Sequence, residues 1–166
     1  MVKGRIERVA NCSRMQEALN SFSTRIDEIV EWIIAIQQIP APTFDEADRA
    51  DFIESRFVQL GLQDVRKDNI NNVVGRFPGT NPGVNKPGII SAHSDTVFPA
   101  GTDLRVRRHN HTLSGPGIGD NSTGVAGLFA VADTLRRYDL QPRADLWFVS
   151  NVGEEGLGDL RGMRAV

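Results

Sequence analysis

Apolar residues recur along this chain first at helical and later at strand spacing. From Thr24 onward they return every three or four positions, which predicts an amphipathic helix closed by Pro40 and Pro42. A second stripe, which ends before Gly61, predicts another helix. The apolar residues of the two stripes are Ile26, Ile29, Val30, Ile33 and Ile34, and then Ala47, Ala50, Ile53, Phe57 and Leu60.

The segment before the second helix has the form of a capping box. Thr43 is followed three residues later by Glu46, and such a pair can satisfy free N–H groups at a helix start.

The rest of the chain alternates between strand and helix patterns. Strands are predicted around Val65, at 72–77, from 89 to 93 and from 146 to 149. A polar hairpin is predicted at 104–113 and a helix at 123–138. Residues 78–88 are rich in Gly, Pro and Asn, which predicts turns. This alternation predicts an α/β fold, a sheet with helices on both faces.

Length and chain ends bear on the domain organisation. The 166 residues suffice for one domain with an apolar core. Residues 1–22 are expected to form an N-terminal arm and residues 23–166 the domain. The chain stops a few residues after its most polar loop, so we expect an N-terminal part of a longer protein.

Charge and cysteine content limit the kinds of partner and the cellular compartment that we expect. There are 19 Lys and Arg residues against 21 Asp and Glu residues, and this balance gives no basic excess that would favour nucleic acid or an anionic membrane. Cys12 is the only cysteine, and no apolar signal or membrane-spanning run is found. We therefore expect a cytoplasmic protein.

Three polar clusters follow apolar strands or Gly-rich turns. They are His93-Ser94-Asp95, Gly119-Asp120-Asn121 and Gly153-Glu154-Glu155-Gly156. Because open α/β sheets bind ligands at the carboxyl ends of their strands, the clusters are expected to converge. Asp95, two residues after His93, would then face one ring nitrogen while the other nitrogen binds a metal.

Each cluster also has a reading without metal. A carboxylate can satisfy His93 by itself, the glycines before Asp120 can indicate a nucleotide-binding loop, and adjacent glutamates can form a solvated acidic turn. The glycine spacing does not complete the dinucleotide fingerprint, and Glu154 and Glu155 would repel one another without nearby positive charge. The occurrence of all three clusters in one chain favours a site in which imidazole and carboxylate groups bind zinc, cobalt or manganese, with a spare glutamate to deprotonate water. Two metals that share a carboxylate would polarise a scissile carbonyl.

Three strings carry a family resemblance: Ser-Ala-His-Ser-Asp-Thr-Val (91–97), Gly-Pro-Gly-Ile-Gly-Asp-Asn-Ser-Thr-Gly (115–124) and Gly-Glu-Glu-Gly-Leu-Gly-Asp-Leu-Arg-Gly (153–162). They resemble the co-catalytic zinc metallopeptidases of family twenty, which include acetylornithine deacetylase, succinyl-diaminopimelate desuccinylase, carboxypeptidase G and peptidase T. The resemblance extends from residues 39–46 to the end of the chain. It implies a zinc-exopeptidase-like catalytic domain that is incomplete at its C-terminus.

The resemblance also implies roles for single residues. His93 would ligate one metal, Asp120 would bridge two, Glu155 would ligate the other, Asp95 would orient His93, and Glu154 would be the general base. A cis peptide is expected between Asp120 and Asn121. His109 and His111 are left out, since they lie in a polar hairpin without a neighbouring acid.

The implied activity is hydrolysis of an amide or peptide bond in a small peptide or N-acyl amino acid, with two divalent metals, most simply Zn²⁺. Two family ligands and a lid and dimerisation domain have no counterpart here, so the chain alone is expected to be nearly inactive, and a homodimer would form through the missing domain. Two alternatives stay open. One is an aminopeptidase of a related two-zinc family, and the other is a non-catalytic metal-binding fragment.

Overall fold

The structure, a computed structural model, describes residues 2–81, 83 and 86–166. Residue 1 of the predicted arm and residues 82, 84 and 85 of the predicted turn region lie outside the described residues. The helices are α1 (Val2–Ala10), α2 (Ser13–Thr24), α3 (Ile26–Gln37), α4 (Ala47–Gln59), α5 (Thr123–Arg137) and α6 (Arg161–Ala165). The strands are β1 (Gln63–Lys67), β2 (Val73–Phe77), β3 (Gly88–His93), β4 (Arg107–His109), β5 (Thr112–Ser114) and β6 (Leu146–Asn151). Two short irregular turns are η1 (Ile118–Ser122) and η2 (Gly156–Gly158).

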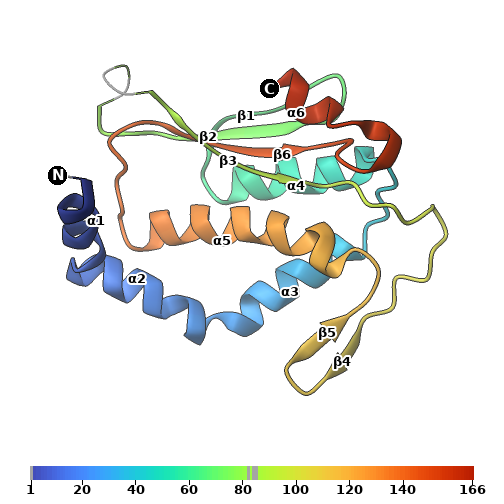
Figure 1. Ribbon diagram of the computed structural model, residues 1–166, viewed down its shortest axis with the longest axis horizontal. Coiled ribbons are helices and arrows are strands. Elements are labelled where there is room, and N and C mark those ends of the chain that lie inside the picture. Colours follow the sequence, from blue (N-terminus) through green and yellow to red (C-terminus); the bar gives the residue numbers. More distant parts are fainter. Residues whose placement is uncertain (1, 82, 84–85) are drawn as a thin grey trace.

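A mixed sheet forms the centre of the molecule. Its strand order is β1-β2-β6-β3, with β3 parallel to β6 and the other neighbouring pairs antiparallel. Strands β4 and β5 form a separate hairpin that projects from the body (Figure 1). The predicted α/β fold is confirmed.

Helices α4 and α5 cover one face of the sheet. The ring of Phe57 on α4 meets the ring of Phe129 on α5 edge to face, with centroids 6.0 Å apart. Helix α3 packs on the outer side of α5, and Trp32 reaches the same Phe129 ring. The short α6 lies on the other side of the sheet from α5 (Figure 1). Phe57, Phe129 and the strand residue Phe148 are fully buried, so the core lies between the sheet and this helical layer.

Local sequence explains these elements. Alternate residues of β2 are buried, as expected for a strand with one face on a core. Helix α4 buries the predicted Ala50, Ile53 and Phe57 and is followed by Gly61, whose φ of +78° suits a helix end. The predicted arm of residues 1–22 falls on α1 and most of α2, so its described part is helical.

The predicted capping box at the start of α4 is wrong. The helix begins at Ala47, and its N-cap Glu46 makes no side-chain capping bond. The Thr43 hydroxyl donates instead to Asp95 at 2.9 Å, and the Glu46 carboxylate accepts the N–H of Phe44 at 2.9 Å and pairs with Arg161. Both side chains are thus engaged by distant parts of the chain.

Candidate metal centre

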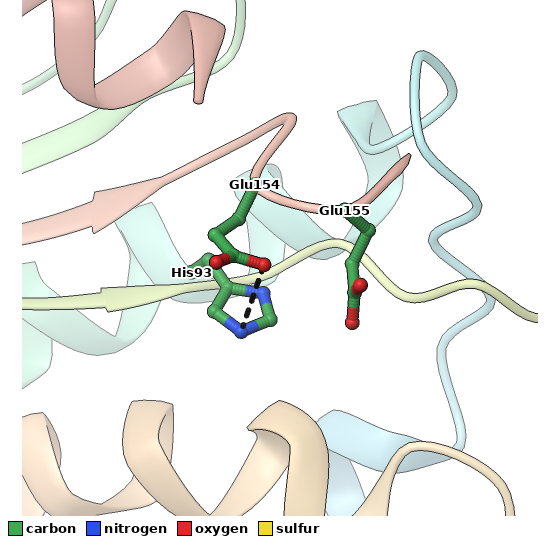
Figure 2. A group of neighbouring side chains, drawn as sticks. All are labelled: His93, Glu154 and Glu155. Atoms are coloured by element: carbon green, nitrogen blue, oxygen red, sulfur yellow. Dashed lines mark ion pairs between the residues drawn. The ribbon is translucent and has the colours of Figure 1, made fainter. Parts of the chain in front are cut away.

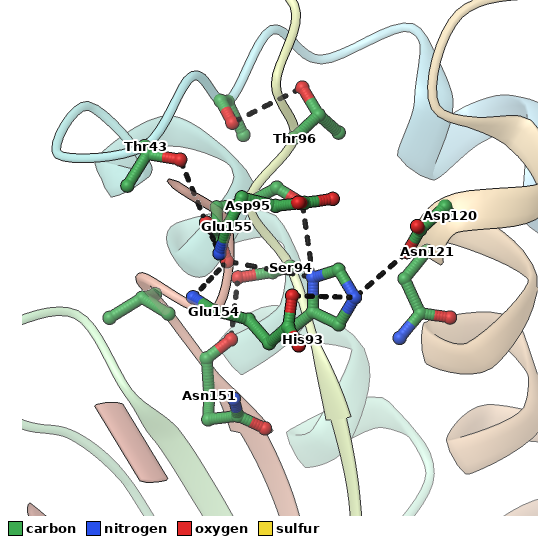
Figure 3. A network of polar contacts seen from close by, with 12 residues as sticks. Thr43, His93, Ser94, Asp95, Thr96, Asp120, Asn121, Asn151, Glu154 and Glu155 are labelled. Atoms are coloured by element: carbon green, nitrogen blue, oxygen red, sulfur yellow. Dashed lines mark hydrogen bonds and ion pairs between the residues drawn. The ribbon is translucent and has the colours of Figure 1, made fainter. Parts of the chain in front are cut away.

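The parallel pairing of β3 and β6 brings two of the polar clusters together. His93 ends β3 and lies in register with Asn151, the last residue of β6, and the N–H of Ser94 donates to the carbonyl of Asn151 at 2.8 Å. Parallel strands point their carboxyl ends the same way, so the residues that follow each strand meet at one edge. Glu154 and Glu155 therefore come to lie beside His93 (Figure 3).

His93 is nearly buried and has a partner at each ring nitrogen. Its Nδ1 atom lies 3.2 Å from the main-chain carbonyl of Asp95 and 3.6 Å from the Asp95 carboxylate. The hydrogen bond predicted for the carboxylate is therefore made by the carbonyl of the same residue. When Nδ1 carries the proton and donates it there, the lone pair of Nε2 is free to bind a metal.

The Nε2 side of His93 faces acids. Asp120 Oδ1 lies 2.9 Å from Nε2 (Figure 3). Glu154 Oε2 lies 3.8 Å from the same nitrogen (Figures 2 and 3). Burial by itself lowers the pKa of His93, but the nearby Asp95 carboxylate, together with the charges of Glu154 and Asp120, outweighs this effect. The pKa of His93 is raised.

Asp95 is a fully buried acceptor that joins three chain segments. Its carboxylate accepts the backbone N–H groups of Glu154 and Glu155, each at 3.0 Å, and the Thr43 hydroxyl at 2.9 Å (Figure 3). Burial favours the neutral acid, but these bonds and His93 favour the anion more strongly and lower the pKa of Asp95 to about 2. Asp95 thus fixes the backbone of both glutamates as well as flanking the imidazole.

Asp120 enters the site from η1, directly before α5. Its side chain is 75% exposed, apart from the contact with His93. The peptide bond between Asp120 and Asn121 is cis, as the resemblance predicts. Asn121 accepts the N–H of Gly124 at 3.0 Å, and a Cβ at Gly124 would collide with the Asn121 side chain. The small residue here is therefore required by close packing.

The two glutamates complete a donor cluster. One ligand atom from each of His93, Glu154 and Glu155 lies within 4.8 Å of the others (Figure 2). Burial, followed by the charge of Asp120, raises the pKa of Glu155. An imidazole and carboxylates that repel one another suit a divalent cation, so the residues fit a metal.

Not every candidate joins this group. Asp120 touches His93 but falls outside the compact set, which contains Glu154 instead. Which glutamate ligates therefore stays a prediction. His109 and His111 are exposed in the β4–β5 hairpin.

Three supporting residues were not predicted as parts of the site: Thr43, Glu46 and Arg161. Glu46 is fully buried, and both its oxygens lie within 2.8 Å of Arg161 Nη2. Thr43 and Glu46 lie in the 39–46 segment and Arg161 in the 153–162 string, so the strings that carry the resemblance contained the signal.

Comparisons with known proteins identify a family for this chain. Residues 72–163 match the family model described as peptidase family M28. A search of curated proteins gives no significant match. In the described part of the chain, no helix is both long and apolar enough to cross a bilayer.

Solved structures share the fold. Aminopeptidase PepT from Bacillus cereus is 24% identical over 84% of this chain and 39% of its own, with a TM-score of 0.71. The di-peptidase Dug1p from Saccharomyces cerevisiae is 18% identical over 86% and 36%, with a TM-score of 0.69. Aminoacylhistidine dipeptidase from Vibrio alginolyticus is 20% identical over 95% and 31%, with a TM-score of 0.63. This chain thus spans less than half the length of these proteins.

Proposed function

The chain belongs to the M20/M28-type metallopeptidases, and on that premise we propose that it forms part of a metal-dependent hydrolase. Its substrate is an amide or peptide bond in a small peptide or N-acyl amino acid. The observation that carries the proposal is the convergence of His93 with Glu154 and Glu155 at the carboxyl ends of β3 and β6.

The metal would be held by His93, Asp120 and Glu155, with Asp120 shared between two ions. Nitrogen and carboxylate donors of this kind suit Zn²⁺ best, with Co²⁺ or Mn²⁺ as alternatives. A divalent ion bound there supplies Lewis acidity that polarises the scissile carbonyl.

Glu154 is the proposed general base. Its side chain is 39% exposed, so it can reach both solvent and substrate, while its backbone is fixed by Asp95. The carboxylate takes a proton from the attacking water and passes it to the departing amine nitrogen. Asp95 keeps the imidazole of His93 oriented through its carbonyl oxygen.

Two substrate classes are candidates. The names of the similar structures, an aminopeptidase and two dipeptidases, favour short peptides. The match to a family described as a peptidase likewise favours a peptide over an N-acyl amino acid as the substrate. A panel of dipeptides, tripeptides and their N-acetylated forms separates the two classes.

The test uses the full gene product and a Glu154→Gln variant. The variant keeps the shape of the side chain but removes the base, so kcat is expected to fall by about 100-fold or more with metal content unchanged. Glu17→Gln, at an exposed position on α2, is the control and is expected to keep full activity. Unchanged kcat in Glu154→Gln, or a wild-type protein that binds no divalent metal, would refute the proposal.

A further inference from the structure

An ion pair between the buried Glu46 and the partly exposed Arg161 links the segment before α4 to the turn that carries the glutamates. The Glu46 carboxylate has no exposed surface and lies 2.7 and 2.8 Å from Arg161 Nη2. The same carboxylate accepts the N–H of Phe44 at 2.9 Å, and the guanidinium lies 5.0 Å from the centroid of the Phe44 ring. Arg161 is thus held by both the charge and the ring of one short segment.

The side chain of Arg161 lies directly over Gly153, the residue before Glu154. A Cβ at Gly153 would come within 2.5 Å of Arg161 Cγ and Nε. The backbone N–H of Arg161 also donates to the carbonyl of Gly153 at 3.2 Å, and the N–H of Gly158 donates to that of Glu155 at 2.8 Å. The turn from 153 to 161 is therefore a closed loop with Arg161 packed on its first residue.

Two buried carboxylates consequently join the same pair of segments. Asp95 links Thr43 to the N–H groups of Glu154 and Glu155, and Glu46 links the neighbouring Phe44 to Arg161. Asp95 contacts the amides of the glutamates, whereas Glu46 fixes the guanidinium that packs beside them. Losing the second link would free the loop to move away from Asp95.

We propose that Glu46 and Arg161 are a positioning pair that holds the Glu154–Glu155 backbone against Asp95 and thereby sets the direction of the Glu154 carboxylate. The backbone part stands on contacts alone, and the consequence for catalysis rests on the proposed function. Glu46 and Arg161 themselves touch neither substrate nor metal in this proposal.

Energetics favour a geometric role over a purely stabilising one. The Glu46 carboxylate is fully out of water, whereas the Arg161 side chain is 27% exposed. The desolvation cost offsets much of their attraction, so the ion pair contributes little net stability compared with apolar side chains of similar volume. Arg161 Nε is in addition buried without a hydrogen-bond partner. The pair instead fixes the orientation of the Arg161 side chain relative to Glu46, since the guanidinium is rigid and its donors lie in one plane.

The first experiment measures hydrogen exchange at the amides of Glu154 and Glu155 in the metal-free full gene product. Glu46→Gln keeps an acceptor for Phe44 but removes the charge, and exchange at both amides is expected to accelerate about tenfold or more, the effect of one weakened charge-assisted bond. The matched control is Asp133→Asn. Asp133 lies more than two turns into α5, and the substitution removes its buried carboxylate, which pairs with Arg25. Equal acceleration in the control, or none in Glu46→Gln, overturns the proposal.

A second experiment separates positioning from stability. The double variant Glu46→Gln with Arg161→Met leaves no unpaired buried charge, so its unfolding midpoint is expected to recover relative to either single variant. The protection of the two amides is expected to stay low, and kcat to stay reduced about tenfold with KM within about twofold. Recovery of amide protection with stability would overturn the positioning role. If the wild-type protein hydrolyses no substrate, the proposed function is wrong but the positioning of the backbone by Glu46 and Arg161 is unaffected, because the exchange result is independent of activity.

Discussion

The Nε2 atom of His93 lies 2.9 Å from the Oδ1 atom of Asp120, although one residue ends a strand and the other precedes a helix. The two differ sharply in exposure, since the His93 side chain is 11% exposed and that of Asp120 is 75% exposed. His93 is therefore the fixed partner, held by β3 and Asp95, and Asp120 is the partner free to adjust. A cation that arrives from solvent would meet Asp120 first.

This arrangement predicts the effect of Asp120→Asn. The substitution keeps the size of the side chain and removes its charge, so the affinity for Zn²⁺ is expected to fall by about tenfold or more, as measured by titration calorimetry. Asp159→Asn removes an exposed carboxylate that pairs with Arg164 and is the control for loss of net charge. Equal affinities in the two variants would exclude Asp120 as a ligand.

Removing the Asp95 charge is expected to destabilise the fold. In Asp95→Asn, the amide cannot accept all of the bonds that the carboxylate now receives, and at least one buried N–H or O–H group loses its acceptor. The free energy of unfolding, from urea denaturation of metal-free protein, is expected to fall by about 3 kcal/mol. Thr43→Val removes only one of these donors, and about 1 kcal/mol is expected for it. A loss in Asp95→Asn no larger than in Thr43→Val would contradict the central role of Asp95.

The low pKa of Asp95 also predicts how stability depends on pH. The pKa is about 2 in the folded chain against an ordinary value of 3.8, so the native state binds this proton less tightly than the unfolded state. The stabilisation is complete above about pH 5 and is lost as the pH falls from about 4 towards 2, and its full size is roughly 2 kcal/mol. Urea unfolding of metal-free protein at pH 6 and pH 3 measures this, since about half is expected to remain at pH 3. Asp95→Asn should lack this part of the pH dependence, and an identical slope in both proteins would argue against it.

The convergence of the site could be predicted because it follows from strand direction. His93 and Glu154 each come just after an apolar strand, and parallel strands deliver such residues to one edge. The contact of Asp120 with His93 could be anticipated in the same way, because Asp120 leads into the helix that packs beneath β3. Local sequence patterns and the rule on the carboxyl ends of strands were therefore sufficient to predict that the three polar clusters converge.

The supporting contacts could not be predicted, because they depend on side chains that are distant in sequence. Thr43 and Glu46 fit a local capping box, but Arg161, 115 residues beyond Glu46, forms an ion pair with the buried Glu46 carboxylate. A desolvated charge needs the strongest available partner, and that need overrides a cap at the surface. The atom of Asp95 that meets His93 Nδ1 depends likewise on the three donors that occupy the carboxylate.

Gly153 offers a test of the loop that needs no charge change. Its φ is +61°, and an added Cβ would come within 2.5 Å of Arg161, so Gly153→Ala must either strain the turn or displace the arginine. Gly156 lies in the same turn with a φ of +49° and open space around the added carbon, so Gly156→Ala has the backbone strain without the collision. Strain alone is expected to cost about 1 kcal/mol in each variant. The collision should add a further loss in unfolding free energy and weaken Zn²⁺ binding in Gly153→Ala only, as measured by urea denaturation and titration calorimetry. If the two variants bind zinc equally well, Arg161 does not need its place over Gly153 for the site to form.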